Sequence, residues 1–205
     1  MSLHNTDTDF FGKQDGERIL FVARPHSIAL IVRLSKIYLV ALGVFLAIVL
    51  LGSSFLPSRT PVVLGFVTAL LIGAIGTKIA VDYQNRDIAY VTDRRLVRFE
   101  PTTLVATNPR SITWDEVVKV KTYPPNFIWK QMAIGSVVVH ARTTIRTAED
   151  TPSGTVVADD IEVNDIYFYK DLGNYIDKIL FTYKQRPKEM DLIHEFVPKP
   201  KWERY

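Results

Sequence analysis

The fold is decided by two apolar stretches, IYLVALGVFLAIVLLGSSFL at Ile37–Leu56 and TPVVLGFVTALLIGAIGT at Thr60–Thr77, with only Pro57-Ser58-Arg59 between them. Neither stretch contains a charged side chain. An α-helix rises about 1.5 Å per residue, so each stretch can cross the roughly 30 Å of a bilayer's hydrocarbon core. The short separation leaves room only for a tight reversal. The sequence therefore predicts a transmembrane helical hairpin at residues 37–81.

The composition fits one small folded domain beside this membrane element. The chain has 205 residues, a formal net charge of +3 and no cysteine. The absence of cysteine removes disulfides, thiolate nucleophiles and thiolate metal ligands. Basic residues are interspersed with acidic ones, whereas proteins that bind nucleic acid cluster them on one face. We therefore expect no nucleic-acid partner.

Basic residues flank the hairpin at both outer ends. Those before it are Arg18, Arg24, Arg33 and Lys36, those after it are Lys78, Arg86, Arg94, Arg95 and Arg98, and the connecting loop carries only Arg59. Loops rich in lysine and arginine stay on the cytoplasmic side of a membrane. We therefore expect a multi-pass protein of the cell (inner or plasma) membrane with both termini in the cytoplasm.

Small residues repeat along one face of the second apolar stretch. Gly65, Ala69 and Gly73 follow one another at intervals of four, which lets another helix approach closely. This face is expected to pack either on the first span of the same chain, through Gly43 and Ala47, or on a second copy. The sequence alone leaves both arrangements open.

Two segments precede the hairpin. Residues 1–16 are polar and rich in aspartate and glycine, which is typical of a flexible leader. Residues 17–36 form a basic pre-membrane segment, in which Pro25 is well placed to open a helix. Residues 24–36 either lie on the anionic leaflet as an interfacial helix or extend the first span into the cytosol.

The pattern after the hairpin changes from helical to alternating, which predicts a β-rich cytoplasmic domain at residues 82–186. Strands are expected at Asp87–Thr92, Arg95–Phe99, Thr103–Thr107, Glu116–Tyr123, Gly135–Ala141, Thr155–Ala158 and Ile161–Val163. Apolar residues from Leu172 to Tyr183 have the spacing of an amphipathic helix, which Pro187 limits. The chain is thus expected to be α+β, with a β-sandwich or barrel capped by a C-terminal helix. The tail, residues 187–205, is either disordered or docked as an extended peptide on its own domain or a partner.

Several short motifs occur in an order that resembles a known family. They are Glu17-Arg18-Ile19-Leu20, Arg24-Pro25-His26, Tyr90-Val91-Thr92-Asp93-Arg94-Arg95-Leu96, Ile112-x-Trp114-x-x-Val117 and Ile134-Gly135-Ser136-Val137. With the two spans and the closing helix, the chain resembles the membrane-anchored bacterial pleckstrin-homology-like family (YdbS/YdbT-type proteins) from about Glu17 to about Tyr183. The resemblance implies a pleckstrin-homology-like split barrel with a C-terminal helix, facing the cytoplasm. It implies architecture more than mechanism, because the activity of that family is poorly defined.

No residue pattern indicates catalysis. The four histidines lie far apart, and no pair has the spacing of metal ligands. The neighbouring carboxylates Glu149-Asp150 and Asp159-Asp160 fall in predicted loops, where such groups are usually solvated. The sequence contains no glycine-rich phosphate loop, serine elbow or zinc-protease motif. We therefore expect no enzymatic activity, no cofactor, no metal and no small-molecule substrate.

Basic residues are one set of candidates for binding. Arg94 and Arg98, together with Arg33 and Lys36, could hold the phosphate of an anionic lipid. Strand alternation, however, places Arg94 and Arg98 on one face and Arg95 on the other, so the guanidinium groups do not converge. The alternative is a solvated strand face near the membrane.

Apolar residues around Pro124-Pro125 are the second set. Tyr123, Phe127, Ile128 and Trp129 form either an exposed patch suited to protein contact or interfacial insertion, or part of the core at one end of the barrel. The whole sequence predicts an interaction or scaffold module, integral to the lipid membrane, that assembles with protein partners or with itself. Binding of anionic lipid headgroups is the alternative function.

Overall fold

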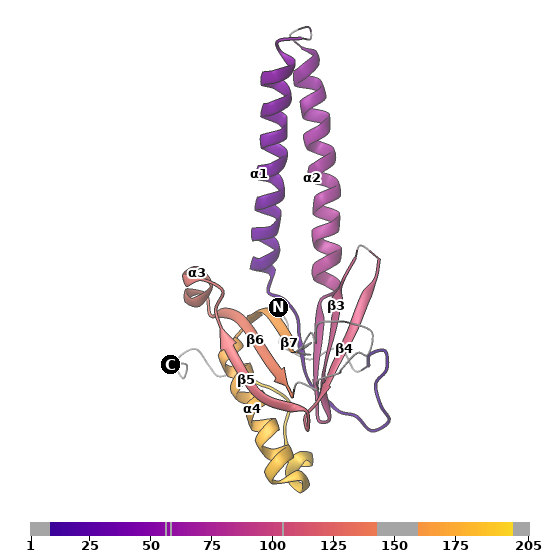
Figure 1. Cartoon of the computed structure of the whole chain (residues 1–205), viewed down its shortest axis with the longest axis vertical. Helices are drawn as coiled ribbons and strands as arrows, with labels where there is room; N and C mark the ends of the chain where they lie inside the picture. Colours follow the sequence, from indigo (N-terminus) through magenta and orange to yellow (C-terminus); the bar gives the residue numbers. More distant parts are fainter. Residues whose placement is uncertain (1–8, 56, 58, 104, 143–159, 199–205) are drawn as a thin grey trace, which may run out of the picture.

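Two long antiparallel helices project from a β-rich body in the computed structural model, which describes residues 9–198 except 56, 58, 104 and 143–159 (Figure 1). Helix α1 spans Ser27–Gly52 and helix α2 spans Thr60–Arg86. Both are long and apolar enough to cross a membrane. The predicted hairpin of two apolar helices is therefore confirmed. Because α1 begins at Ser27, the residues before Ile37 extend the first span, which was one of the two open arrangements.

The small-residue face of α2 packs on α1 of the same chain. A Cβ atom added to Gly65 would lie 3.1 Å from the ring of Phe45, and one added to Gly73 would lie 3.2 Å from the ring of Tyr38. Ala69, on the same face, is half-buried. Glycine is needed here because aromatic rings of α1 occupy the space that larger side chains would fill.

Gly43 and Ala47 do not take part in this contact, contrary to expectation. Both are exposed on α1, and nothing lies within 4 Å of a Cβ built on Gly43. The contact therefore joins small residues on one helix to large rings on the other.

Two antiparallel sheets form the β-rich body. The first has the order β1 (Ile19–Ala23), β2 (Ile88–Thr92), β3 (Arg95–Pro101) and β4 (Thr107–Thr113), and the second has the order β5 (Val117–Tyr123), β6 (Ile134–Ala141) and β7 (Ile161–Tyr167). A short helix α3 (Phe127–Gln131) lies between β5 and β6, and helix α4 (Tyr169–Gln185) is followed by a 3₁₀ helix η1 (Pro187–Leu192). The chain is α+β, as expected.

The core lies between the two sheets and α4. It includes Trp114 on the β4–β5 connection, Leu96 in β3 and Val137 in β6, all fully buried. The inward face of α4 contributes Ile176 and Ile179, also fully buried. The amphipathic spacing of this helix thus predicted the side that faces the sheets.

The helical hairpin is inserted between two neighbouring strands of one sheet. β1 pairs with β2, although α1 and α2 separate them in the sequence. Both ends of the hairpin therefore meet the same sheet, and both must lie on the same side of a membrane that the hairpin spans. Residues 17–36 do not form one pre-membrane element, because β1 and the start of α1 divide them. The β-domain is likewise not confined to residues 82–186.

The expected strands agree with the structure except around β4. Instead of a strand at Thr103–Thr107, β4 begins at Thr107 and runs through Pro109. A proline is tolerated there because β4 is an edge strand. The strand expected at Thr155–Ala158 lies outside the described residues.

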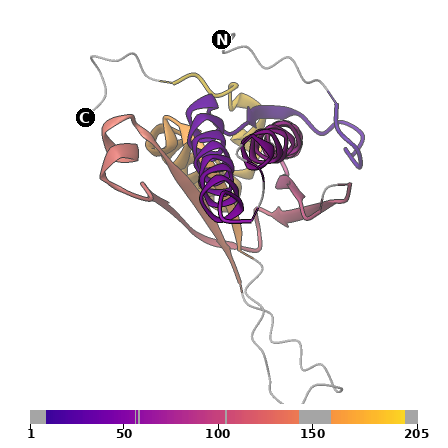
Figure 2. The same ribbon diagram turned by 90° about the horizontal axis from the view of Figure 1, so that it is seen from above.

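Seen along the helices, α3 and the β3–β4 turn lie on opposite sides of the hairpin (Figure 2).

Candidate functional site

Arg98, a candidate for binding lipid phosphate, lies inside the domain. Its side chain is 7% exposed, and its Nε and Nη2 atoms each donate to the Asp87 carboxylate at 3.1 Å. Its Nη1 atom donates to the Glu162 carbonyl in β7. Asp87 directly follows α2, so Arg98 joins the base of the hairpin to both sheets. A lipid phosphate cannot reach this guanidinium in the structure.

Burial raises the pKa of the Asp87 carboxyl above its ordinary value, and the nearby Arg98 guanidinium opposes this shift. Without Arg98, the Asp87 carboxylate would be left buried and uncompensated. The main role of the arginine is thus to hold the junction between the helices and the sheets.

Arg33 forms a second charged contact at the base of the hairpin. Its Nη2 atom lies 3.6 Å from the Asp165 carboxylate, and its guanidinium carbon lies 5.3 Å from the centre of the Tyr83 ring in α2. The carbonyl of Asp165 accepts a hydrogen bond from the His26 amide at 2.7 Å. Burial raises the pKa of the Asp165 carboxyl, although Arg33 opposes the rise. Arg33 is therefore directed toward protein.

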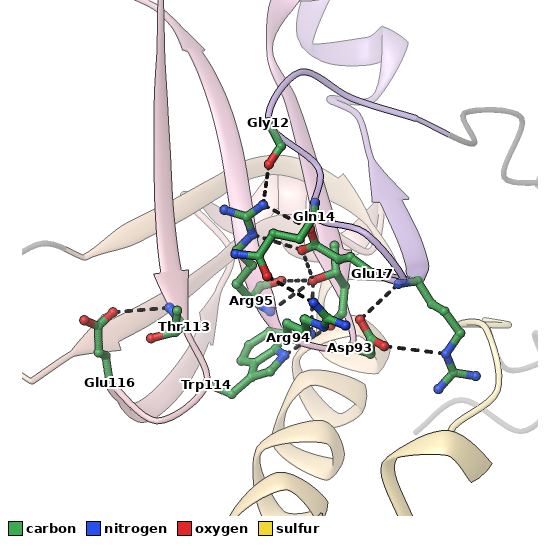
Figure 3. Close-up of polar contacts among 11 residues, drawn as sticks. Gly12, Gln14, Glu17, Asp93, Arg94, Arg95, Thr113, Trp114 and Glu116 are labelled. Atoms are coloured by element: carbon green, nitrogen blue, oxygen red, sulfur yellow. Dashed lines mark hydrogen bonds and ion pairs between the residues drawn. The ribbon is translucent and has the colours of Figure 1, made fainter.

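A polar network lies at the β2–β3 turn (Figure 3). The Glu17 carboxylate accepts hydrogen bonds from Arg95 Nε and Nη2, both at 3.0 Å, and from the Thr92 hydroxyl at 2.8 Å. It also accepts from the backbone N–H of Gln14 at 2.8 Å, and Arg95 donates further to the Gly12 carbonyl at 2.6 Å. Glu17 itself is only 3% exposed.

Burial by itself would raise the pKa of the Glu17 carboxyl, but the hydrogen bonds from Arg95, Gln14 and Thr92 lower it overall. The carboxylate is thus ionised at neutral pH and fully engaged. This network ties the chain before β1 to the β2–β3 turn, which is a structural role.

Neighbouring residues of the stretch Tyr90–Leu96 also make structural contacts. The Thr92 hydroxyl accepts from the Arg94 amide at 3.2 Å, and the Thr92 carbonyl accepts from the Trp114 indole at 3.1 Å. Asp93 accepts from the Arg18 amide at 3.0 Å. Thr92, Asp93 and Trp114 therefore stabilise the first sheet.

Arg94 lies at the end of β2 that is farther from the hairpin. Because β2 starts just after α2 and runs for five residues, the turn that follows is about 17 Å from the helix. Arg94 Nη1 donates to the Gln14 side chain at 3.2 Å. The candidates for lipid phosphate are Arg33, Lys36, Arg94 and Arg98. Arg33 and Arg98 are ion-paired and Arg94 lies away from the hairpin, so among these four only Lys36 is an exposed cation on the hairpin.

Phe127, Ile128 and Trp129 lie on α3 and divide between the two expected roles. The Asn126 side chain caps this helix by accepting from the Trp129 amide at 2.9 Å. Trp129 is 9% exposed and anchors α3, whereas Phe127 and Ile128 are 70% and 61% exposed. One aromatic residue thus belongs to the domain interior, and the other two residues form an exposed apolar patch.

The described part of the tail docks on its own domain. Ile193 is buried in the core, and the Tyr175 hydroxyl of α4 donates to the His194 carbonyl at 2.6 Å. The Phe196 amide donates to the Leu20 carbonyl of β1 at 3.0 Å. The segment around Phe196 therefore covers part of the open side of β1.

The outer edges of β4 and β7 are made less available for pairing with another strand, each in a different way. Pro109 removes one amide donor from β4. β7 lies beside the first sheet, where its Glu162 carbonyl accepts from Arg98.

β5 is the remaining edge. It pairs with β6 on one side, and within the described residues no strand pairs with its other side. Val118 is 56% exposed, Tyr123 is 42% exposed, and Lys119 and Lys121 are exposed between them. Sequence reasoning missed this edge, apart from Tyr123, because an edge is defined by pairings that are distant in sequence.

Within the part of the chain that the structure describes, no group of three or more histidine, cysteine or acidic side chains could hold a metal ion. His140 and Asp160 form one pair, with 2.7 Å between Nδ1 and Oδ2. A pair of this kind supplies too few ligands for a metal centre.

Comparisons with protein-family models, with curated proteins and with solved structures found no match for this chain. The architecture and the exposed surfaces are therefore the basis for a functional proposal.

Proposed function

We propose that this protein is a membrane-anchored, non-enzymatic interaction module whose β-domain binds an extended segment of a partner protein along β5. The open edge of β5 carries the proposal. The tail meets β1 at Phe196, Pro109 interrupts β4 and the first sheet flanks β7. By contrast, no strand among the described residues pairs with the outer side of β5, where the Val117 carbonyl accepts a hydrogen bond from Lys184 of α4. An exposed edge binds an extended peptide through main-chain hydrogen bonds, and the neighbouring side chains set specificity.

The charge of β5 indicates the chemistry of the partner. Lys119 and Lys121 are both exposed on this strand. Edge-to-edge pairing of two copies would bring four lysines together, and like charges across strands are unfavourable. An extended segment with acidic side chains avoids this repulsion. We therefore favour an acidic segment of another protein over self-association at this edge.

The hairpin places this binding surface at the membrane. Basic residues outside the two spans favour a cytoplasmic β-domain, and the ion pairs of Arg98 and Arg33 fix the domain relative to the helices. A tethered domain raises the effective concentration of any partner already at the membrane. The physical contribution of the module is thus local capture in a defined orientation.

The architecture supports a pleckstrin-homology-like domain. Sheets of four and three antiparallel strands followed by a C-terminal helix agree with the split barrel that the resemblance implies. On this proposal, the membrane hairpin is an insertion between the first two strands of the barrel. Recognition of lipid headgroups by Arg94 and Arg98 is not favoured, because the Arg98 guanidinium is buried against Asp87 at the base of the hairpin and Arg94 lies at the end of β2 farther from the hairpin.

Site-specific photocrosslinking in native membranes tests the proposal. A photoreactive residue at Lys119 or Lys121 is expected to give an adduct with a partner protein, and one at Arg110 on the β4 edge serves as the matched control. Replacing the neighbouring lysine with glutamate should abolish the adduct, and replacing it with arginine should preserve it. Equal adducts from both edges, or an adduct with a second copy of this chain, would contradict the proposal.

A further inference from the structure

The exposed surface of the hairpin indicates where the bilayer begins. Among the described residues, exposed apolar side chains start at Ile31 on α1, which is 59% exposed, and end at Ile79 on α2, which is 38% exposed. The helix from Ile31 to Gly52 is about 33 Å long, and the helix from Thr60 to Ile79 is about 30 Å long. Both lengths match a hydrocarbon core of about 30 Å.

The charged residues within these limits are compatible with this boundary. Arg33 is turned toward Asp165 and the Tyr83 ring, so protein groups shield its charge. Lys36 and Lys78 are exposed, and their long apolar stems allow the ammonium groups to reach the headgroups.

α3 lies at the level where α1 begins (Figure 1). Ser27 and Ile31 are about one helical turn, or 6 Å, apart. The headgroup region of a bilayer is about 5–8 Å deep on each side. An element at this level therefore faces lipid headgroups, and α3 presents Phe127 and Ile128 there at 70% and 61% exposure.

The β3–β4 turn reaches a similar level on the opposite side of the hairpin (Figures 1 and 2). Hydrogen bonds hold this turn, with the Thr102 amide donating to the Ala106 carbonyl at 3.0 Å and the Ala106 amide to the Thr103 hydroxyl at 2.9 Å. Val105 projects from it with 90% of its surface exposed. Both α3 and the β3–β4 turn thus carry exposed apolar side chains at the level where α1 begins.

We infer that Phe127, Ile128 and Val105 insert into the headgroup region, so that the β-domain rests on the bilayer at two points beside the hairpin. Moving apolar side chains out of water lowers the free energy, and a large exposed apolar surface is typical of a contact site. The anchored Trp129 and the Asn126 cap make α3 a rigid support for this contact. The contact would fix the tilt of the domain, and it does not depend on the partner proposed for β5.

Single-cysteine probes test this inference, because the chain contains no native cysteine. The full chain with Phe127→Cys, Ile128→Cys or Val105→Cys is labelled with an environment-sensitive dye. It is then reconstituted into vesicles of phosphatidylcholine and phosphatidylglycerol that carry a headgroup-depth spin-label quencher. We expect a blue shift and severalfold stronger quenching at these positions than at the control position.

Leu192→Cys is the matched control. Leu192 is 70% exposed, as Phe127 is, but it lies on η1 at the end of the molecule opposite the hairpin. Quenching at positions 127 and 128 no stronger than at position 192 would overturn the inference. Quenching at α3 but not at position 105 would overturn the two-point contact. Shielding of position 127 only when a soluble protein is added would assign α3 to a protein partner and would also overturn it.

Discussion

Replacing Glu17 with glutamine removes the charge at the centre of the network while preserving the size of the side chain. Glu17 accepts hydrogen bonds from Arg95, Thr92 and Gln14, and the Arg95 side chain is only 15% exposed. Removing one partner of a buried ion pair costs about 3–5 kcal/mol. Arg95 keeps its bond to the Gly12 carbonyl, so we expect the lower end, a loss of about 3 kcal/mol in the free energy of unfolding.

The size of this loss depends on pH. The folded protein lowers the pKa of Glu17 below its ordinary value of 4.5. The ionised carboxylate therefore stabilises the fold above pH 4.5, and this contribution disappears as the pH falls through the folded pKa. Glutamine does not titrate. The difference between the wild type and Glu17→Gln should thus be largest at neutral pH and shrink in acid.

Thermal unfolding of the full chain in a mild detergent measures this difference. Near-ultraviolet circular dichroism reports on the packing of the aromatic residues, among them Trp114, whose indole donates to the Thr92 carbonyl beside the network. A loss of 1 kcal/mol lowers the melting temperature of a chain of this size by about 2–4 °C, so we expect a drop of about 6–12 °C at neutral pH. In the Glu17→Gln background, Arg95→Gln should cost little more. A drop of less than about 2 °C, or an equal drop in acid, would refute the reasoning.

Three further predictions concern the hairpin, its base and the tail. Gly65→Leu should cost about 1–3 kcal/mol in a dodecyl-sulfate unfolding titration, because a Cβ there already lies 3.1 Å from a ring of α1, whereas Gly43→Leu meets open space and should cost nothing measurable. Arg98→Met should lower the melting temperature at neutral pH by leaving the Asp87 carboxylate uncompensated. Because the pKa of Asp87 is already raised, protonation should restore part of this loss as the pH falls, so the difference from the wild type should shrink in acid, as for Glu17→Gln. Equal melting temperatures for Arg98→Met and the wild type at neutral pH would count against this prediction. Phe196→Ala should cost about 2 kcal/mol, since the half-buried ring packs on β1 and α4, and should speed tryptic cleavage in the tail, so unchanged proteolysis would argue against tail docking.

Elements with a strong local pattern could be predicted from the sequence. The apolar stretches around Ile37–Leu56 and Thr60–Thr77 specify helices because length and hydrophobicity suffice. The stretch Glu116–Tyr123, which contains β5, alternates clearly, and the spacing from Leu172 to Tyr183 marks the buried face of α4. These features depend on neighbours in the chain.

Features that depend on distant pairing could not be predicted. The sequence predicts a pre-membrane segment where β1 forms, because the partner of β1, strand β2, follows only after the whole hairpin. β4 runs from Thr107 to Thr113 and not over Thr103–Thr107, because its pairing with β3 outweighs the usual depletion of proline in strands.

The candidate site shows the same limit. The sequence offers Arg98 either as a lipid-phosphate ligand or as part of a solvated strand face, but the side chain is buried against Asp87, a pairing that no local pattern reveals. The sequence predicts one role for Phe127, Ile128 and Trp129 together, but a single helical turn buries Trp129 and leaves the other two exposed.

Labelling of a cysteine in the helical connection tests the central claim most directly, namely that the hairpin crosses the membrane and leaves the β-domain in the cytoplasm. Ser54→Cys lies in the exposed turn at the tip of the hairpin, and Lys188→Cys is exposed on η1. In intact cells, a membrane-impermeant maleimide should label position 54 and should reach position 188 only after permeabilisation. Labelling of position 188 in intact cells, or protection of position 54, would contradict the account.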